Sequence, residues 1–107
     1  MSETKFTPGP WHKDERSDIY VRDSEGDYIA ETYAPMPKRK RAKGENEANA
    51  HLIAAAPELY EALEKAAEVF RAYQSHHEAN RHTDKAERNK FYAEQIEAAL
   101  TKARGEA

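Results

Sequence analysis

The stretch "EANAHLIAAAPELYEAL", residues 47–63, decides the fold that we predict for this chain. It carries a nearly continuous apolar run, which Pro57 interrupts. Because proline lacks an N–H group, it fits best in the first turn of a helix. We therefore predict two helices that meet at Ala56-Pro57, of which the first runs from residue 46 to about residue 55. The expected N-terminal cap of this short helix is Asn46 or Glu45.

Apolar residues follow Pro57 at intervals of three and four, the spacing of a helix that packs against another helix. They are Leu59, Leu63, Ala66, Phe70 and Tyr73. A further helix is predicted after Asp84, which is a potential cap with Glu87 three residues later. Its apolar seam comprises Tyr92, Ile96, Ala99 and Ala103, with Leu100 beside them. Two arrangements remain open: an antiparallel helical hairpin that turns near residues 76–83, or a single long helix through them.

Residues 6–33 predict β-structure. Two prolines in "FTPGPW", residues 6–11, exclude a helix there. The stretches "DIYVRD" and "DYIAETY" alternate in hydrophobicity, and Gly26 suits a turn residue with positive φ between them. We predict a hairpin over residues 17–33, with an earlier strand near Trp11. The next stretch, "APMPKRKRAKGEN", has two prolines and five positive charges and is expected to be a linker.

The predicted fold class is therefore α+β. An N-terminal antiparallel β-hairpin or small sheet precedes a short helix and a C-terminal helical hairpin or long helix. We expect a single small domain over residues 6–107. Its parts are the sheet (6–33), the basic linker (34–45) and the helices (46–104).

Composition narrows the classes of function. The chain has 107 residues, a formal net charge of −3 and no cysteine, which excludes disulfides and thiolate chemistry. The net charge argues against general nucleic-acid binding, and no apolar stretch approaches the roughly 20 residues of a membrane span. So polar a chain has a thin core, which favours a homo-oligomer joined through the helices. The expected interface comprises Leu59, Leu63, Phe70, Tyr73, Tyr92 and Ile96.

Seven residues are candidates for contacts with a small ligand: Trp11, Tyr20, Arg22, Arg39, Arg41, Asn49 and His51. Aromatic rings and arginine planes stack on nucleobases. An asparagine amide both donates and accepts hydrogen bonds, and the basic run "KRKRAK", residues 38–43, offers positive charge to phosphate. Each candidate also has a structural interpretation, as ordinary sheet packing, a solvated arm or a local helix contact.

No pattern typical of catalysis is found, so we expect neither an enzyme nor a bound cofactor. The chain has no glycine-rich phosphate loop and no serine-histidine-acid arrangement. His76, His77 and His82 lack the spacing of a zinc-binding helix and are interpreted as a polar turn without a metal.

Two motifs together resemble a family of small phage and prophage proteins. One is "TPGPW" at residues 7–11, and the other is "EANAHLIAAAPELYEAL", similar to that family's NAxLIAAAPELLxAL-like segment. The two bracket a variable middle in the family, and the resemblance covers residues 6 to about 63. The outline of a sheet followed by a short and an extended helix is also similar to phage sponge proteins that counter the Thoeris defence system.

These resemblances imply a phage protein that acts in the cytoplasm of an infected bacterial host. The leading hypothesis is an inhibitor of host immunity that sequesters a cyclic or ADP-ribose-type signalling nucleotide. The alternatives are a protein-binding inhibitor of a host defence complex, such as a CRISPR effector, and a phage assembly protein.

Overall fold

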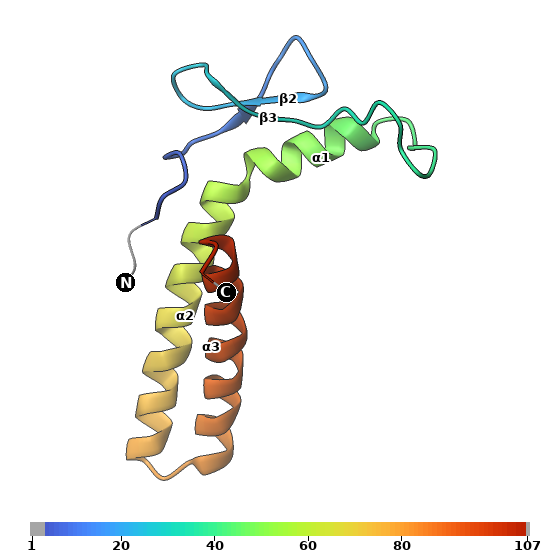
Figure 1. Cartoon of the computed structure of the whole chain (residues 1–107). Helices are drawn as coiled ribbons and strands as arrows, with labels where there is room; N and C mark the ends of the chain where they lie inside the picture. Colours follow the sequence, from blue (N-terminus) through green and yellow to red (C-terminus); the bar gives the residue numbers. More distant parts are fainter. Residues whose placement is uncertain (1–3, 107) are drawn as a thin grey trace. The chain divides into compact units, whose positions relative to one another are not determined.

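The computed structural model describes residues 4–106, and its fold is α+β as predicted. A three-stranded antiparallel sheet is followed by three helices (Figure 1). The described chain divides into two compact units, of which one comprises residues 6–59 and the other begins at Tyr60. The expectation of a single domain stays a prediction.

The first unit contains the sheet, whose spatial order β1-β2-β3 follows the chain. The strands are β1 (His12–Lys13), β2 (Tyr20–Arg22) and β3 (Tyr28–Glu31). This confirms both the predicted hairpin and the earlier strand near Trp11. The turn between β2 and β3 contains Gly26 with a φ of 90°, a conformation that glycine adopts without strain.

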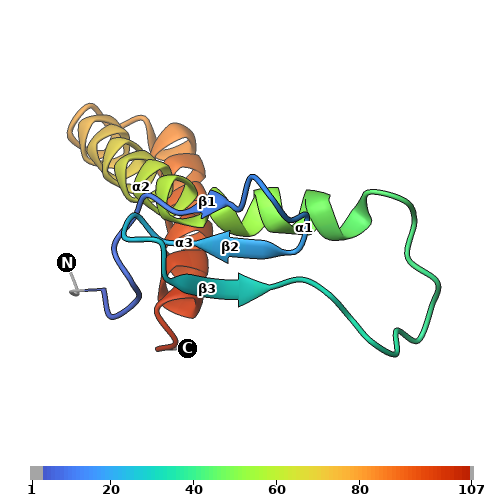
Figure 2. The same cartoon turned by 90° about the horizontal axis from the view of Figure 1, so that it is seen from above.

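Helix α1 (Glu45–Ala54) runs along one face of this sheet (Figures 1 and 2). The core between them comprises Val21 from β2 and Ala50 and Ala54 from α1. Four partly buried side chains surround it: Trp11, Ile29, Ala30 and Ile53. The two alanines allow the helix backbone to approach the strand closely, so Val21 has no exposed surface.

The predicted cap of α1 is wrong. The helix begins after Gly44, which has a φ of 81° and takes the place that we gave to Asn46 or Glu45. Those two side chains have other partners. The amide oxygen of Asn46 accepts a hydrogen bond from Arg41, and Glu45 accepts one from the Ala42 N–H at 3.2 Å.

The break at Pro57 is confirmed, because α1 ends at Ala54 and α2 (Ala56–Ala79) begins two residues later. Gly9 packs directly against this proline. A Cβ atom placed on Gly9 would lie 2.7 Å from the Cβ of Pro57, which is too close for any side chain. The two motifs of the sequence, around Gly9 and around Pro57, thus contact each other in the folded chain.

The second unit is a helical hairpin of α2, from Tyr60 onward, and α3 (Thr83–Ala103). The chain reverses at residues 80–82, where Arg81 has a φ of 60°, so the hairpin alternative is correct and the single long helix is wrong. The predicted cap at Asp84 is also wrong. The N-cap is His82, two residues earlier, and it makes no side-chain capping hydrogen bond.

The buried contact between the two helices lies beside the seams that we predicted. The buried positions recur every seven residues: Tyr60 and Ala67 on α2, and Ala86, Ala93 and Leu100 on α3. The predicted seam residues lie at the edge of this contact or outside it, with Leu63, Tyr73 and Tyr92 exposed by 37%, 53% and 45%. The predicted seams are therefore displaced from the fully buried contact, while Phe70 and Tyr92 still meet across the two helices, and the role of these residues in an oligomer stays a prediction.

Candidate ligand-binding site

The candidate site is a hollow in the first unit, between the end of β3, the loop that follows it and α1. Its volume is about 340 Å³. It is lined by Glu31, Thr32, Tyr33, Arg41, Asn49, Leu52 and Ile53. The fold thus brings together two of the seven predicted ligand residues, Arg41 and Asn49.

Thr32 fixes the strand side of the hollow. This buried residue comes directly after β3. Its hydroxyl donates to the backbone carbonyl of Asn46 at 2.9 Å and also lies 3.3 Å from that of Ile19. The end of β3 is therefore tied both to β2 and to the first turn of α1. Tyr33 follows with 55% of its surface exposed, so its ring is accessible at the rim of the hollow.

Arg41 is held in place by three neighbours. Its Nη1 atom donates to the Thr32 carbonyl at 3.0 Å and to the amide oxygen of Asn46, and its Nε lies 3.9 Å from Glu45. Its Nη2 group makes no hydrogen bond to any of residues 4–106. The guanidinium is thus fixed in orientation while two of its N–H donors remain available, which suits it to bind an anion.

Asn49, Leu52 and Ile53 line the helix side of the hollow. Their spacing of three and four residues places them on one face of α1. Asn49 is partly buried, and among the described residues its side-chain amide has no hydrogen-bond partner. A partly buried amide without a partner is suited to exchange hydrogen bonds with a ligand.

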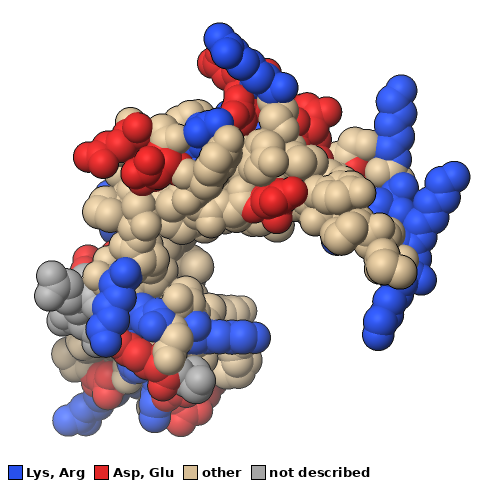
Figure 3. Space-filling view, turned by 45° about the horizontal axis from the view of Figure 1, so that its top comes forward, with Lys and Arg blue, Asp and Glu red and all other residues tan. Residues whose placement is uncertain are grey.

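Arg39 lies outside the lining, in the basic segment "KRKRAK" (38–43) next to it. It binds Glu45 through two hydrogen bonds of 2.7 and 3.0 Å. This guanidinium, together with the Ala42 N–H, lowers the pKa of Glu45 below its usual range. Figure 3 shows Lys and Arg side chains projecting from the loop between β3 and α1. The segment is thus anchored at Glu45 and exposes positive charge beside the hollow.

The other predicted residues of the sheet do not reach the hollow. Trp11 packs against the core beneath the sheet, and its indole N–H donates to the Thr7 carbonyl at 3.1 Å. Tyr20 and Arg22 alternate with the buried Val21, so they lie on the opposite face of the sheet. There Tyr20 contacts the ring of Tyr28 at a centroid distance of 4.9 Å.

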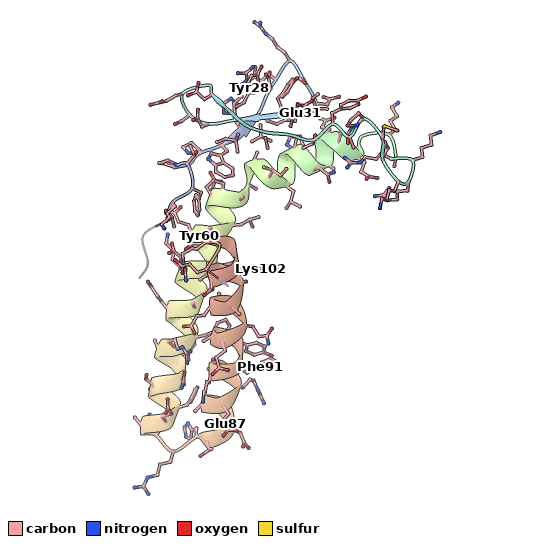
Figure 4. All side chains as sticks on the ribbon, viewed as in Figure 1. Tyr28, Glu31, Tyr60, Glu87, Phe91 and Lys102 are labelled. Atoms are coloured by element: carbon pink, nitrogen blue, oxygen red, sulfur yellow. The ribbon has the colours of Figure 1, made fainter. Side chains whose placement is uncertain are left out.

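Each of the three guanidinium nitrogens of Arg22 donates a hydrogen bond on that outer face. The guanidinium binds the Asp14 carboxylate at 2.8 Å, the Gly26 carbonyl at 2.7 Å and the Tyr28 hydroxyl at 2.9 Å. It also lies 4.0 Å from the centre of the Tyr28 ring. Tyr28 is labelled in Figure 4, on the side of the sheet away from α1. These contacts support the structural interpretation of Arg22.

His51 lies on another face of α1. It comes two residues after Asn49, which turns its side chain about 200° around the helix axis. Its imidazole lies 3.7 Å from Glu47 on the exposed side of the helix. His51 therefore cannot share a small ligand with Asn49 in this hollow.

Sequence reasoning missed Thr32, Tyr33 and Glu31 as lining residues. The predicted hairpin extends to Tyr33, whereas β3 ends at Glu31 and leaves Tyr33 beyond the strand. A signal was present in the sequence: Tyr33 directly precedes the linker that contains Arg41. What the sequence does not reveal is that the linker folds back to place Arg41 against Thr32.

A larger hollow of about 660 Å³ lies on the helical hairpin, and the two arginines that line it already have partners. Arg71 binds Glu97 through two hydrogen bonds of 2.6 and 3.0 Å, and Arg104 donates to the Tyr60 hydroxyl at 3.0 Å. None of the predicted ligand residues lines it. The smaller hollow is therefore the better candidate.

The histidines lie at the turn of the hairpin. The Nδ1 atoms of His77 and His82 are 3.3 Å apart. Partial burial, together with the neighbouring His76 and His82, lowers the pKa of His77. Within residues 4–106, no cluster of three or more His, Cys, Asp or Glu side chains could hold a metal ion. No helix in this range is long and apolar enough to cross a membrane.

Comparison with known proteins gives one match. The model of the family described as Salmonella phage P22 protein Y8K6 matches residues 1–107, the whole chain. The chain belongs to this family. No curated protein and no solved structure matches it. Membership in the Y8K6 family confirms the predicted origin in a phage protein family, whereas the resemblance to anti-defence proteins stays a prediction.

Proposed function

We propose that this Y8K6-family protein sequesters a cyclic or ADP-ribose-type signalling nucleotide and thereby inhibits host antiviral immunity. It acts without catalysis, in the cytoplasm of the infected host, as a homo-oligomer joined through its helices. The observation that carries the proposal is the convergence of Arg41, Asn49 and Tyr33 on one hollow beside the basic segment. Membership in a phage protein family supports the setting in which such an inhibitor acts.

Each of the three residues supplies one element of nucleotide recognition. Arg41 offers the free N–H donors of Nη2 to a phosphate group. Asn49 offers an amide that pairs with the donor and acceptor edge of a base. The exposed ring of Tyr33 offers a surface on which a base stacks, a contact worth about 1–3 kcal/mol per base. No covalent step is needed, because tight binding alone removes the signal from solution.

The volume of the hollow sets what it holds. Small-molecule sites usually enclose about 300–1,000 Å³, and this hollow of about 340 Å³ is at the lower end of that range. It therefore accommodates one nucleoside portion, while the phosphates and the remainder of a larger ligand lie over the basic segment. This arrangement predicts that binding weakens as the salt concentration rises, because exposed charges are screened.

The first test is native mass spectrometry of the full-length protein with a panel of cyclic dinucleotides, cyclic trinucleotides and ADP-ribose isomers. We expect one of these to remain bound at a fixed ratio per chain. A folded protein that retains no member of the panel would overturn the nucleotide proposal. Capture of a host protein complex by the same sample would then support the protein-binding alternative.

The second test locates the site by titration calorimetry with the retained nucleotide. We expect Asn49→Ala to raise the dissociation constant by about tenfold or more, the loss of roughly one hydrogen-bonded contact. The matched control is His51→Ala, on another face of the same helix, which should leave affinity unchanged. Equal losses in both variants would show that the ligand does not occupy this hollow.

A further inference from the structure

The helical hairpin has two chemically different faces. On both helices, the residues four positions after the buried seam are charged: Glu64, Arg71, Glu97 and Arg104. Of the five residues three positions after the seam, four are apolar, Leu63, Phe70, Ile96 and Ala103, and the fifth is Asn89 near the turn. Residues four positions after a seam residue lie on one side of the seam, and residues three positions after it lie on the other side. Each helix therefore has a charged side and an apolar side.

The apolar residues of α2 and α3 form one continuous face. Because both helices are right-handed and run antiparallel, the same offset from the seam places both apolar stripes on the same side of the hairpin. The rings of Phe70 and Tyr92 confirm this, since their centroids are 5.5 Å apart across the two helices. We define the hairpin face as Leu63, Ala66, Phe70, Tyr73, Tyr92, Ile96, Ala99 and Ala103.

The hairpin face is uncharged, yet it is largely open to solvent within the described residues. Leu63, Tyr73 and Tyr92 remain exposed by 37%, 53% and 45%. An aromatic side chain presents about 150–250 Å², so the two tyrosines alone leave roughly 200 Å² uncovered. With Leu63 and the partly exposed remainder, the face approaches roughly 400 Å². This is the size of the largest apolar patch on a typical monomer, a patch that is often functional.

The buried contact inside the hairpin is too small to stabilise the two helices well without further packing on this face. Three of the five buried seam residues are Ala67, Ala86 and Ala93, which bury little hydrocarbon. A helical bundle is stabilised by burying about 25 cal/mol per Å² of apolar surface. Most of the large apolar side chains of this unit lie on the hairpin face instead of in the seam. A two-helix unit of this kind is therefore incompletely packed by itself.

We infer that the hairpin face is covered by the same face of a second copy, to give a four-helix bundle. A two-fold interface requires a surface that is complementary to itself, and a face without charge meets its copy without repulsion. Pairing two such hairpins produces the four-helix arrangement in which apolar stripes are usually buried. The inference specifies the helix interface of the homo-oligomer in the proposed function and is tested without any nucleotide, because the face and the hollow belong to different compact units.

The available area sets the expected strength of this dimer. About 400 Å² per copy, increased by rim residues such as the half-exposed Val69, approaches the lower limit of about 600 Å² per partner for stable interfaces. We therefore expect a dimer whose dissociation constant is about micromolar. Leu59, another predicted interface residue, is 49% exposed but belongs to the first unit, so it is not part of the hairpin face.

The test is sedimentation velocity on the full-length protein over a concentration series, with a pair of adjacent substitutions. Tyr92→Glu places a charge in the hairpin face. Phe91→Glu is the control, because Phe91 is 55% exposed, against 45% for Tyr92, and points to another side of α3 (Figure 4), so that only the edge of its ring contact with Tyr92, at a centroid distance of 5.7 Å, reaches the face. We expect Tyr92→Glu to raise the dissociation constant at least about tenfold, since a buried unpaired carboxylate is costly. Phe91→Glu should leave it unchanged.

Three results would overturn the inference. They are a monomer at every concentration of the unchanged protein, a dimer that Tyr92→Glu leaves intact, and dissociation by Phe91→Glu to the same degree. Circular dichroism at low concentration checks that both variants are helical. If Tyr92→Glu fails to fold, Ala99→Glu on the same face replaces it, because that exposed alanine makes no ring contact.

Discussion

Val21 is the largest side chain that is completely buried in residues 4–106, so its truncation tests the core of the first unit. It extends from β2 onto Ala50 and Ala54, whose small side chains cannot move to fill a gap. Val21→Ala removes two methyl groups, worth about 0.8 kcal/mol each in transfer free energy. The residual cavity adds to this, so we expect a loss of about 2–3 kcal/mol in the free energy of unfolding.

Trp11 provides the assay. It is the only tryptophan of the chain and packs against the Val21 cluster, so its fluorescence reports unfolding of the first unit. With a urea dependence of about 1 kcal/mol per M for a small protein, the loss corresponds to a midpoint lower by about 2–3 M. The matched control is Val69→Ala on α2, where the side chain is 49% exposed. Its lost contacts are offset by the better helix propensity of alanine, so its midpoint should change little.

The reasoning is refuted if Val21→Ala lowers the Trp11 midpoint no more than Val69→Ala does. Such a result would mean that the sheet and α1 are not held together by this cluster. Far-UV circular dichroism, recorded on the same samples, separates this outcome from a general loss of helix.

Two further perturbations test contacts elsewhere in the chain. Gly9→Ala should destabilise the first unit by about 1–3 kcal/mol, because its Cβ would lie 2.7 Å from that of Pro57. In a protein that already carries Pro57→Gly, Gly9→Ala should lower the urea midpoint less than it does alone. Simple additivity of the two changes would argue against the contact. Arg71 lowers the pKa of Glu97 below its usual value of 4.5, so this ion pair stabilises the hairpin above about pH 4.5 and is lost as the pH falls through the depressed pKa. Glu97→Gln should therefore lower the free energy of unfolding, obtained from urea titration, by about 1 kcal/mol or less at neutral pH, because the pair is so exposed. This difference should vanish in acid. A difference that stays constant with pH would contradict the assignment.

Much of the fold follows from local signals in the sequence. Pro57 specifies the break between α1 and α2, because its ring restricts where a helix can begin. Alternating apolar residues around Val21 specify the hairpin, and Gly26 specifies its turn. The caps were predicted less well. A single asparagine such as Asn46 is a good cap by itself, but in the folded chain Arg41 occupies its side chain.

The helix seam shows a second limit of sequence reasoning. The largest apolar residues suggest the contact, and here they lie beside the most buried positions instead of at them. Alanines at Ala67 and Ala93 pack the helices because they allow close approach, yet alanine is common on any helix surface. The seven-residue repeat of these small positions was the available signal, and it is weaker than a stripe of leucine and tyrosine.

The candidate site could be predicted only in part for a related reason. Asn49 and Arg41 have chemistry that is visible in the sequence, whereas their meeting depends on how residues 34–44 fold back. That path is fixed by contacts between distant segments, chiefly Arg41 with Thr32 and Arg39 with Glu45. Tyr20, Arg22 and Trp11 have equally suitable chemistry, but the alternation of β2 and the packing of the core direct them elsewhere.

The two motifs that resemble the phage family therefore have a mainly structural role. Gly9 packs on Pro57, and Trp11 packs on the cluster that contains Ala50 and Ala54, so the motifs hold the sheet against the helices. The hollow instead takes Tyr33 and Arg41 from the segment between the motifs, which is the variable part in the resemblance. A common fold whose lining residues vary can present different side chains to different ligands.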